Sequence, residues 1–97
     1  MYLRRNSTYY TFISYINNSI GCYISDNFDG TSRFICRAYK EFRLLEDRNE
    51  IKDENIEYFS LCKKYLITIS ENLIQKQFVS EFENKELISL GLETLLN

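Results

Sequence analysis

The stretch IEYFSLCKKYLITISENL, residues 56–73, decides the fold of this chain. Its apolar side chains recur every three or four positions, at Ile56, Phe59, Cys62, Leu66, Ile69 and Leu73. That spacing places them on one face of an α-helix. It predicts a helix over residues 54–75 of about five turns, longer than the average helix. Asp53 directly precedes this range and is a natural N-cap.

A second amphipathic pattern follows the dipeptide Asp29-Gly30, which is typical of a turn. Thr31 and Ser32 come next, and both are good helix N-caps. The apolar residues then recur at helical spacing, at Ile35, Ala38, Phe42 and Leu45. The pattern predicts a second helix over residues 32–45.

A third helix is expected near the end of the chain, over residues 80–95. Ser80-Glu81-Phe82-Glu83 has the form of a capping box, in which the first and fourth side chains satisfy backbone donors at a helix start. Gly91 is a candidate stop or kink. The apolar pattern here comprises Phe82, Leu87, Leu90 and Leu95.

The first thirty residues are compatible with two structures. Polar and apolar residues alternate over 10–16, and Asn17-Asn18-Ser19 separates them from residues 20–25, which favours a β-hairpin. A helix is equally compatible, with Ser7 as its cap and Gly21 near its end. Its apolar face would comprise Tyr9, Phe12, Ile13 and Ile16.

One domain over residues 1–97 is the expected organisation, because the length suits a single core. The fold class predicted is mainly α, a small bundle of three to four helices. Its variant is an α+β fold in which the N-terminal hairpin packs on three helices.

Composition argues against an enzyme. The chain has no His, Trp or Pro, but 8 Tyr and 7 Phe. Without His, no side chain has an ordinary pKa near neutrality for proton transfer, and no hydrolase, phosphate-binding or calcium-loop motif is present. We therefore expect no catalytic residues and no cofactor.

The three cysteines, Cys22, Cys36 and Cys62, are separated by 14 and 26 positions. They form no CxxC pair, and no His completes a metal site, so no metal is expected. An odd number of unpaired thiols is typical of a reducing compartment. No apolar run reaches the roughly 18 residues needed to cross a bilayer. The prediction is a cytoplasmic protein that does not enter a membrane.

Charge is distributed unevenly along the chain, whose net charge is −2. All the arginines lie in the first half, whereas residues 46–57 hold six acidic and two basic side chains. An acidic segment of this kind can imitate phosphates and attract a basic cleft. Tyrosine is enriched at protein interfaces, because it offers a large rigid area with a polar tip.

These features favour a non-enzymatic protein that binds a protein partner and neutralises it by covering its active or binding site. The chain resembles small acidic inhibitors in composition and size, though not in any motif. An immunity or antitoxin-like inhibitor is the most concrete form, with a toxin or nuclease that has a basic cleft as its partner. The predicted partner-binding residues are Glu50, Asp53, Glu54, Glu57 and Tyr58.

Two alternatives remain. Arg33, Arg37 and Lys40 step along the helix over residues 32–45 and form a basic stripe, which a nucleic-acid-binding transcriptional regulator would use. An overall pI near 5.1 argues against that class of protein. A structural subunit of a homo-oligomer is the other alternative. Each of these charged patterns also occurs on ordinary solvated helix faces.

Overall fold

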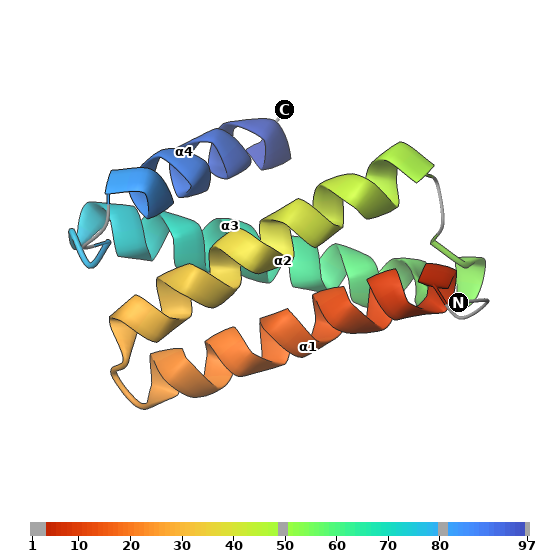
Figure 1. Cartoon of the computed structure of the whole chain (residues 1–97), viewed down its shortest axis with the longest axis horizontal. Helices are drawn as coiled ribbons and strands as arrows, with labels where there is room; N and C mark the ends of the chain where they lie inside the picture. Colours follow the sequence, from red (N-terminus) through yellow and green to blue (C-terminus); the bar gives the residue numbers. More distant parts are fainter. Residues whose placement is uncertain (1–3, 49–50, 80–81, 97) are drawn as a thin grey trace.

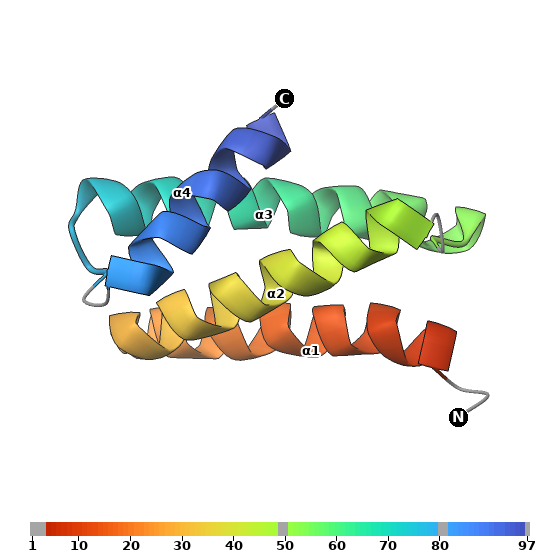
Figure 2. The same ribbon diagram turned by 45° about the horizontal axis from the view of Figure 1, so that its top comes forward.

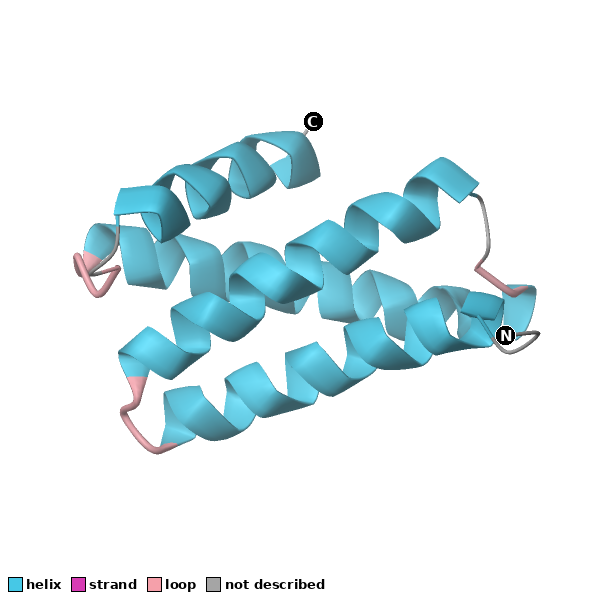
Figure 3. Cartoon of the chain, in the orientation of Figure 1, coloured by secondary structure: helices cyan, strands magenta, loops and turns pink. Residues whose placement is uncertain are grey.

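Helices joined by short connections build the described part of the chain (Figures 1 and 3). The computed structural model describes residues 4–48, 51–79 and 82–96. Helix α1 spans Arg4–Ile24, α2 spans Phe28–Arg48, α3 spans Ile56–Gln75 and α4 spans Phe82–Leu96. A 3₁₀ turn, η1, spans Asp53–Asn55 just before α3. These ranges contain no strand, so the prediction of a mainly α bundle is confirmed.

The alternative of an N-terminal hairpin is wrong, because α1 continues without a break through the residues expected to form the turn. Phe12, Ile16 and Ser19 are buried on one side of α1, which gives the helix a continuous face to pack. The Ser19 hydroxyl donates to the Ile16 carbonyl at 2.7 Å, a bond available only within the helix. Gly21 lies inside α1 and does not end it.

The turn between α1 and α2 lies earlier than the sequence suggested. Asp26 adopts a positive φ of 60°, and Asn27 caps α2 by accepting the backbone N–H of Gly30 on its Oδ1 at 3.0 Å. Helix α2 therefore begins at Phe28, and the predicted turn Asp29-Gly30 is helical. The hydroxyls of Thr31 and Ser32 donate to backbone carbonyls one turn back, so these residues are not N-caps.

The predicted connector after α2 is shorter than expected, because α2 extends through Arg48. The prediction of Asp53 as an N-cap is also wrong. Asp53 is the first residue of η1, and neither Lys52 nor Asn55, the caps of η1 and α3, makes a side-chain capping bond. The first two residues of the predicted capping box, 80 and 81, lie outside the described residues, and α4 is described from Phe82.

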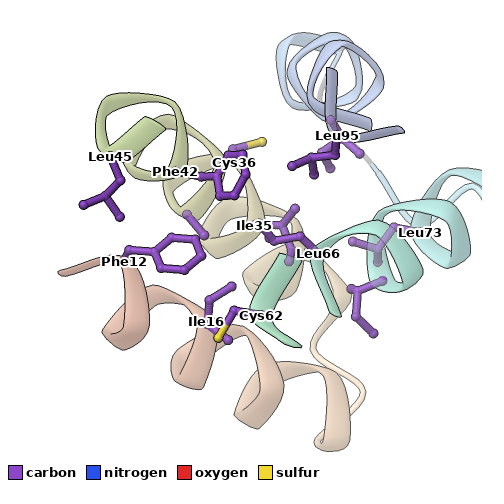
Figure 4. Packing of buried hydrophobic residues seen from close by; sticks show 13 residues of the cluster. Phe12, Ile16, Ile35, Cys36, Phe42, Leu45, Cys62, Leu66, Leu73 and Leu95 are labelled. Atoms are coloured by element: carbon purple, nitrogen blue, oxygen red, sulfur yellow. The ribbon is translucent and has the colours of Figure 1, made fainter. Parts of the chain in front are cut away.

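Three phenylalanines from three helices meet at the core, and Figure 4 shows two of them, Phe12 and Phe42. Phe42 of α2 stacks on Phe59 of α3 with ring centroids 5.0 Å apart. Phe12 of α1 lies 5.4 Å from Phe59 and 6.0 Å from Phe42. Burying a side chain of this size contributes about 1.5–3 kcal/mol, so the triad is a major part of the contact among α1, α2 and α3.

Helix α4 covers the opposite side of α2 from α1 and also packs on α3 (Figure 2). Its apolar pattern was only partly predicted, since Leu95 is buried but Leu90 is 57% exposed. Ile88 is buried instead. Gly91 is buried within α4 and neither ends nor interrupts the helix.

Gly91 allows α4 to approach Tyr39 of α2 closely. A Cβ at this position would lie 2.9 Å from Cγ and Cδ1 of the Tyr39 ring. The same tyrosine links the two helices through its hydroxyl, which donates to Thr94 Oγ1 at 3.2 Å and accepts from Arg43 Nη1 at 2.9 Å. Thr94 in turn donates to the Leu90 carbonyl at 2.9 Å.

Gly91→Ala is expected to destabilise the fold by about 1–3 kcal/mol, because the added methyl group overlaps the rigid base of the Tyr39 ring. In a helix with open space the same change would stabilise by about 1 kcal/mol, so the sign of the effect tests the contact. Chemical denaturation measures the change in the free energy of unfolding. Glu93→Ala, on an exposed position of α4, is the matched control, with an expected effect within about 0.5 kcal/mol. A stabilised Gly91→Ala variant would contradict the close approach.

Polar side chains join α1 to α3. The hydroxyl oxygens of Ser19 and Tyr65 are 3.0 Å apart, and Asn72 Nδ2 donates to the Tyr23 hydroxyl at 3.4 Å. Burial raises the pKa of Tyr65 above its ordinary value of 10.0, and the hydrogen bond with Ser19 offsets part of that rise. The folded protein therefore holds the Tyr65 proton more tightly than the unfolded chain does.

This linkage predicts a loss of stability at alkaline pH. The raised pKa of Tyr65 contributes stability that is fully present below 10.0 and is lost as pH rises through the higher folded value. Tyr65→Phe removes the ionising group, so its free energy of unfolding should fall less steeply above pH 10.0 than that of the wild type. At neutral pH the Tyr65→Phe substitution should lower the free energy of unfolding by about 1 kcal/mol, because it removes a hydrogen bond. Denaturation at a series of pH values tests this, with Tyr10→Phe as the exposed control. Equal alkaline slopes for Tyr65→Phe and the wild type would contradict it.

Candidate protein-binding surface

The predicted acidic residues that the structure describes gather at one end of the bundle. Asp53 and Glu54 lie in η1, and Glu57 lies in the first turn of α3; all three are exposed. Glu50 lies outside the described residues. Figure 1 places η1 and the start of α3 at the same end as the beginning of α1. The acidic residues therefore form one exposed group, here called the acidic end, comprising Asp53, Glu54 and Glu57.

Tyr58 adjoins the acidic end. Its side chain is 45% exposed, and Leu61, one turn further along α3, is 61% exposed. The two residues are three positions apart, so they are neighbours on the helix surface. A half-exposed aromatic ring and an exposed Leu therefore place apolar contact area and negative charge in one short segment.

Helix α1 brings two further tyrosines to this end, and the sequence analysis did not assign them to the site. The rings of Tyr9 and Tyr10 lie 5.6 Å apart, edge to face. Tyr9 is partly buried, and burial raises its pKa; Cys62, Tyr58 and Tyr10 each raise it further. Tyr9 therefore lies near both Tyr58 and Tyr10. No local pattern could show that Tyr9 lies near Tyr58, because the two residues are some fifty positions apart in the chain.

Two of the three cysteines, Cys36 and Cys62, belong to the hydrophobic core. Cys36 and Cys62 are buried, Cys22 is partly buried, and all three are free. Burial raises the pKa of the Cys62 thiol, and a hydrogen bond with Tyr58 opposes that rise. A thiol with a raised pKa is largely protonated at neutral pH and is a poor nucleophile.

The predicted basic stripe lies on α2, away from η1 and α3. Arg33, Arg37 and Lys40 are all exposed, as the helical spacing predicted. The Arg37 guanidinium lies over the Phe34 ring, 5.7 Å from its centroid. The stripe and the acidic end thus belong to different elements, and each can be changed without altering the other.

The described side chains bring no three His, Cys, Asp or Glu residues together in a way that could hold a metal ion. Within residues 4–48, 51–79 and 82–96, no helix has both the length and the apolar character that crossing a bilayer requires.

Comparison with known proteins adds no identification. No family model matches the chain, and neither a curated protein nor a solved structure shows significant similarity to it. Any assignment of function therefore depends on the surface described above.

Proposed function

We propose that this chain is a non-enzymatic, protein-binding inhibitor that neutralises a protein partner by covering its active or binding site. One observation carries the proposal: Tyr58, which is 45% exposed, lies in the same short segment as the exposed residues Asp53, Glu54 and Glu57. The arrangement joins an aromatic anchor to a concentrated negative charge. Both parts are suited to a partner with a basic cleft.

The acidic end would mainly increase the rate at which the partner associates. Three carboxylates within one short segment create a local negative potential, which attracts a basic surface over several ångströms and orients the encounter. A nuclease or toxin that normally binds phosphates offers such a surface. Glu50 belongs to the same segment in sequence and extends the proposed charge.

The aromatic residues would mainly lengthen the lifetime of the complex by slowing its dissociation. Tyr58 has an exposed ring that can enter a partner's cleft, and tyrosines are frequent among the residues that dominate binding energy. Tyr9 supports this position from α1, and Tyr10 extends the aromatic area. The proposed mechanism is occlusion, in which the partner's basic site is filled and substrate is excluded. Immunity and antitoxin proteins work in this way.

Reversing charge at the acidic end tests the proposal. The double variant Glu54→Lys and Glu57→Lys should lose the partner that the tagged wild type captures from its native cell lysate. With that partner purified, calorimetry should show affinity weakened by about tenfold or more, with a slower association rate. Tyr58→Ala should accelerate dissociation instead. An unchanged affinity after the double reversal would refute the acidic mechanism.

The matched control reverses the basic stripe. Arg33→Glu and Arg37→Glu change the same number of exposed charges on α2 and should leave capture of the protein partner intact. The nucleic-acid-binding alternative predicts the opposite pair of results. In that case the wild type would recover nucleic acid that moderate salt releases, and reversal of the stripe would abolish the recovery.

A further inference from the structure

Positive charge is concentrated on the outer side of α2. Figure 1 shows α2 passing in front of α3, with α1 below it and α4 above it. Over residues 30–45 the sequence holds one acidic side chain, Glu41, which is partly buried. The same segment holds four exposed basic side chains, here called the basic face, which are the basic stripe Arg33, Arg37 and Lys40 together with Arg43.

Two of these arginines lie over aromatic rings that join α2 to its neighbours. The Arg37 guanidinium is 5.7 Å from the centroid of the Phe34 ring, and that ring is 6.2 Å from the ring of Tyr15 on α1. The Arg43 guanidinium is 5.9 Å from the Tyr39 centroid and donates to the Tyr39 hydroxyl. Contact with a ring restrains a long side chain, so less conformational entropy is lost when a ligand binds.

Helix α1 adds no charge beside this face. From Asn6 to Ser25 the sequence contains no Asp, Glu, Lys or Arg, so α1 brings no carboxylate against the arginines over that range. Ser14 and Asn18 are exposed and lie within one turn of Tyr15. They offer a hydroxyl and an amide, which can donate and accept hydrogen bonds. The α1 side of the basic face is therefore polar and uncharged.

We propose that the basic face binds single-stranded nucleic acid, with phosphates on its basic groups and an unpaired base stacked on the Arg37 guanidinium. The planar fork of arginine matches the oxygens of a phosphate, and guanidinium planes stack on unpaired bases. From Arg33 to Arg43 the helix rises about 15 Å, at about 1.5 Å per residue. That length corresponds to roughly four phosphates of a stacked strand, which rises about 3.4 Å per nucleotide. Four basic side chains thus meet a similar number of phosphates.

The carboxylates of the chain leave this face positive because they lie mainly outside it. On α2 itself, Asp29 precedes the face, and Glu46 and Asp47 follow it. The acidic end belongs to η1 and the start of α3. At physiological ionic strength, charges more than about 8 Å apart in solvent are largely screened from one another, so a net charge of −2 does not determine the local potential.

The basic face and the acidic end share no residue. The first would bind a strand and the second a protein partner, so this inference does not depend on the proposed inhibitor function. A chain that binds no strand could still bind the partner, and the reverse also holds.

Fluorescence anisotropy of a labelled oligothymidylate of about 15 nucleotides, titrated with the purified full chain, tests the proposal. The wild type should bind at low salt, and the logarithm of its association constant should fall against the logarithm of salt concentration with a slope of about −3, or about 0.7 for each phosphate. Arg33→Glu with Arg37→Glu should weaken binding by about tenfold or more. Arg37→Lys should keep the salt slope but weaken binding by a few fold, because the charge remains and the stacking surface is lost.

The matched control is Lys64→Glu with Lys76→Glu, which makes the same change of net charge at exposed positions away from α2. It should bind the strand with nearly the affinity of the wild type. Glu54→Lys with Glu57→Lys should bind the strand at least as tightly as the wild type. Circular dichroism should show the helical content of the wild type in every variant.

Four results would overturn the proposal. If the wild type leaves the anisotropy unchanged at low salt, the face binds no strand. Equal losses in the Arg33, Arg37 and Lys64, Lys76 double variants would show a response to net charge alone. A duplex of the same sequence that competes as well as the strand would exclude stacking on an unpaired base. Polyglutamate that competes equally well would show that the face accepts any polyanion.

Discussion

The contact among Phe12, Phe42 and Phe59 is the interaction on which the rest of the bundle depends. It is the place where α1, α2 and α3 meet at once, and the stacking of Phe42 on Phe59 joins two helices that follow one another in the chain. Once these three helices are placed, the remaining side of α2 and α3 is available to α4. The position of the acidic end also follows, because η1 leads directly into the helix that carries Phe59.

Most helices could be predicted from the sequence, and the errors have a common physical cause. The face of α3 was predicted well beyond its first turn, since Cys62, Leu66, Ile69 and Leu73 are all buried at helical spacing. Ile56, at the start of the predicted face, is 48% exposed. The start of α2 was misplaced because Asp29-Gly30 and Thr31 have strong local preferences for turns and caps. In the folded chain Asn27 supplies the cap, four residues before Thr31, and packing then holds Thr31 inside the helix. Tertiary contacts outweighed local propensity.

The candidate surface was predictable only where it is local in sequence. Asp53, Glu54, Glu57 and Tyr58 lie within six positions, so their grouping could be recognised from composition. Tyr9 joins them only because α1 and α3 come together in the fold. The role of Gly91 was equally hidden, because a glycine near the end of a helix resembles a stop signal. Its actual function is to leave room for the ring of Tyr39, which belongs to another helix.

Tyr39 has a consequence for the dynamics of the molecule. The face of its ring fills the space that Gly91 leaves, and its hydroxyl makes the hydrogen bonds to Thr94 and Arg43. One side chain therefore makes both a steric and a polar contact between α2 and α4. A change of its rotamer would therefore disturb both contacts together, so the packing of the ring and the hydrogen bond to Thr94 are coupled through one side chain.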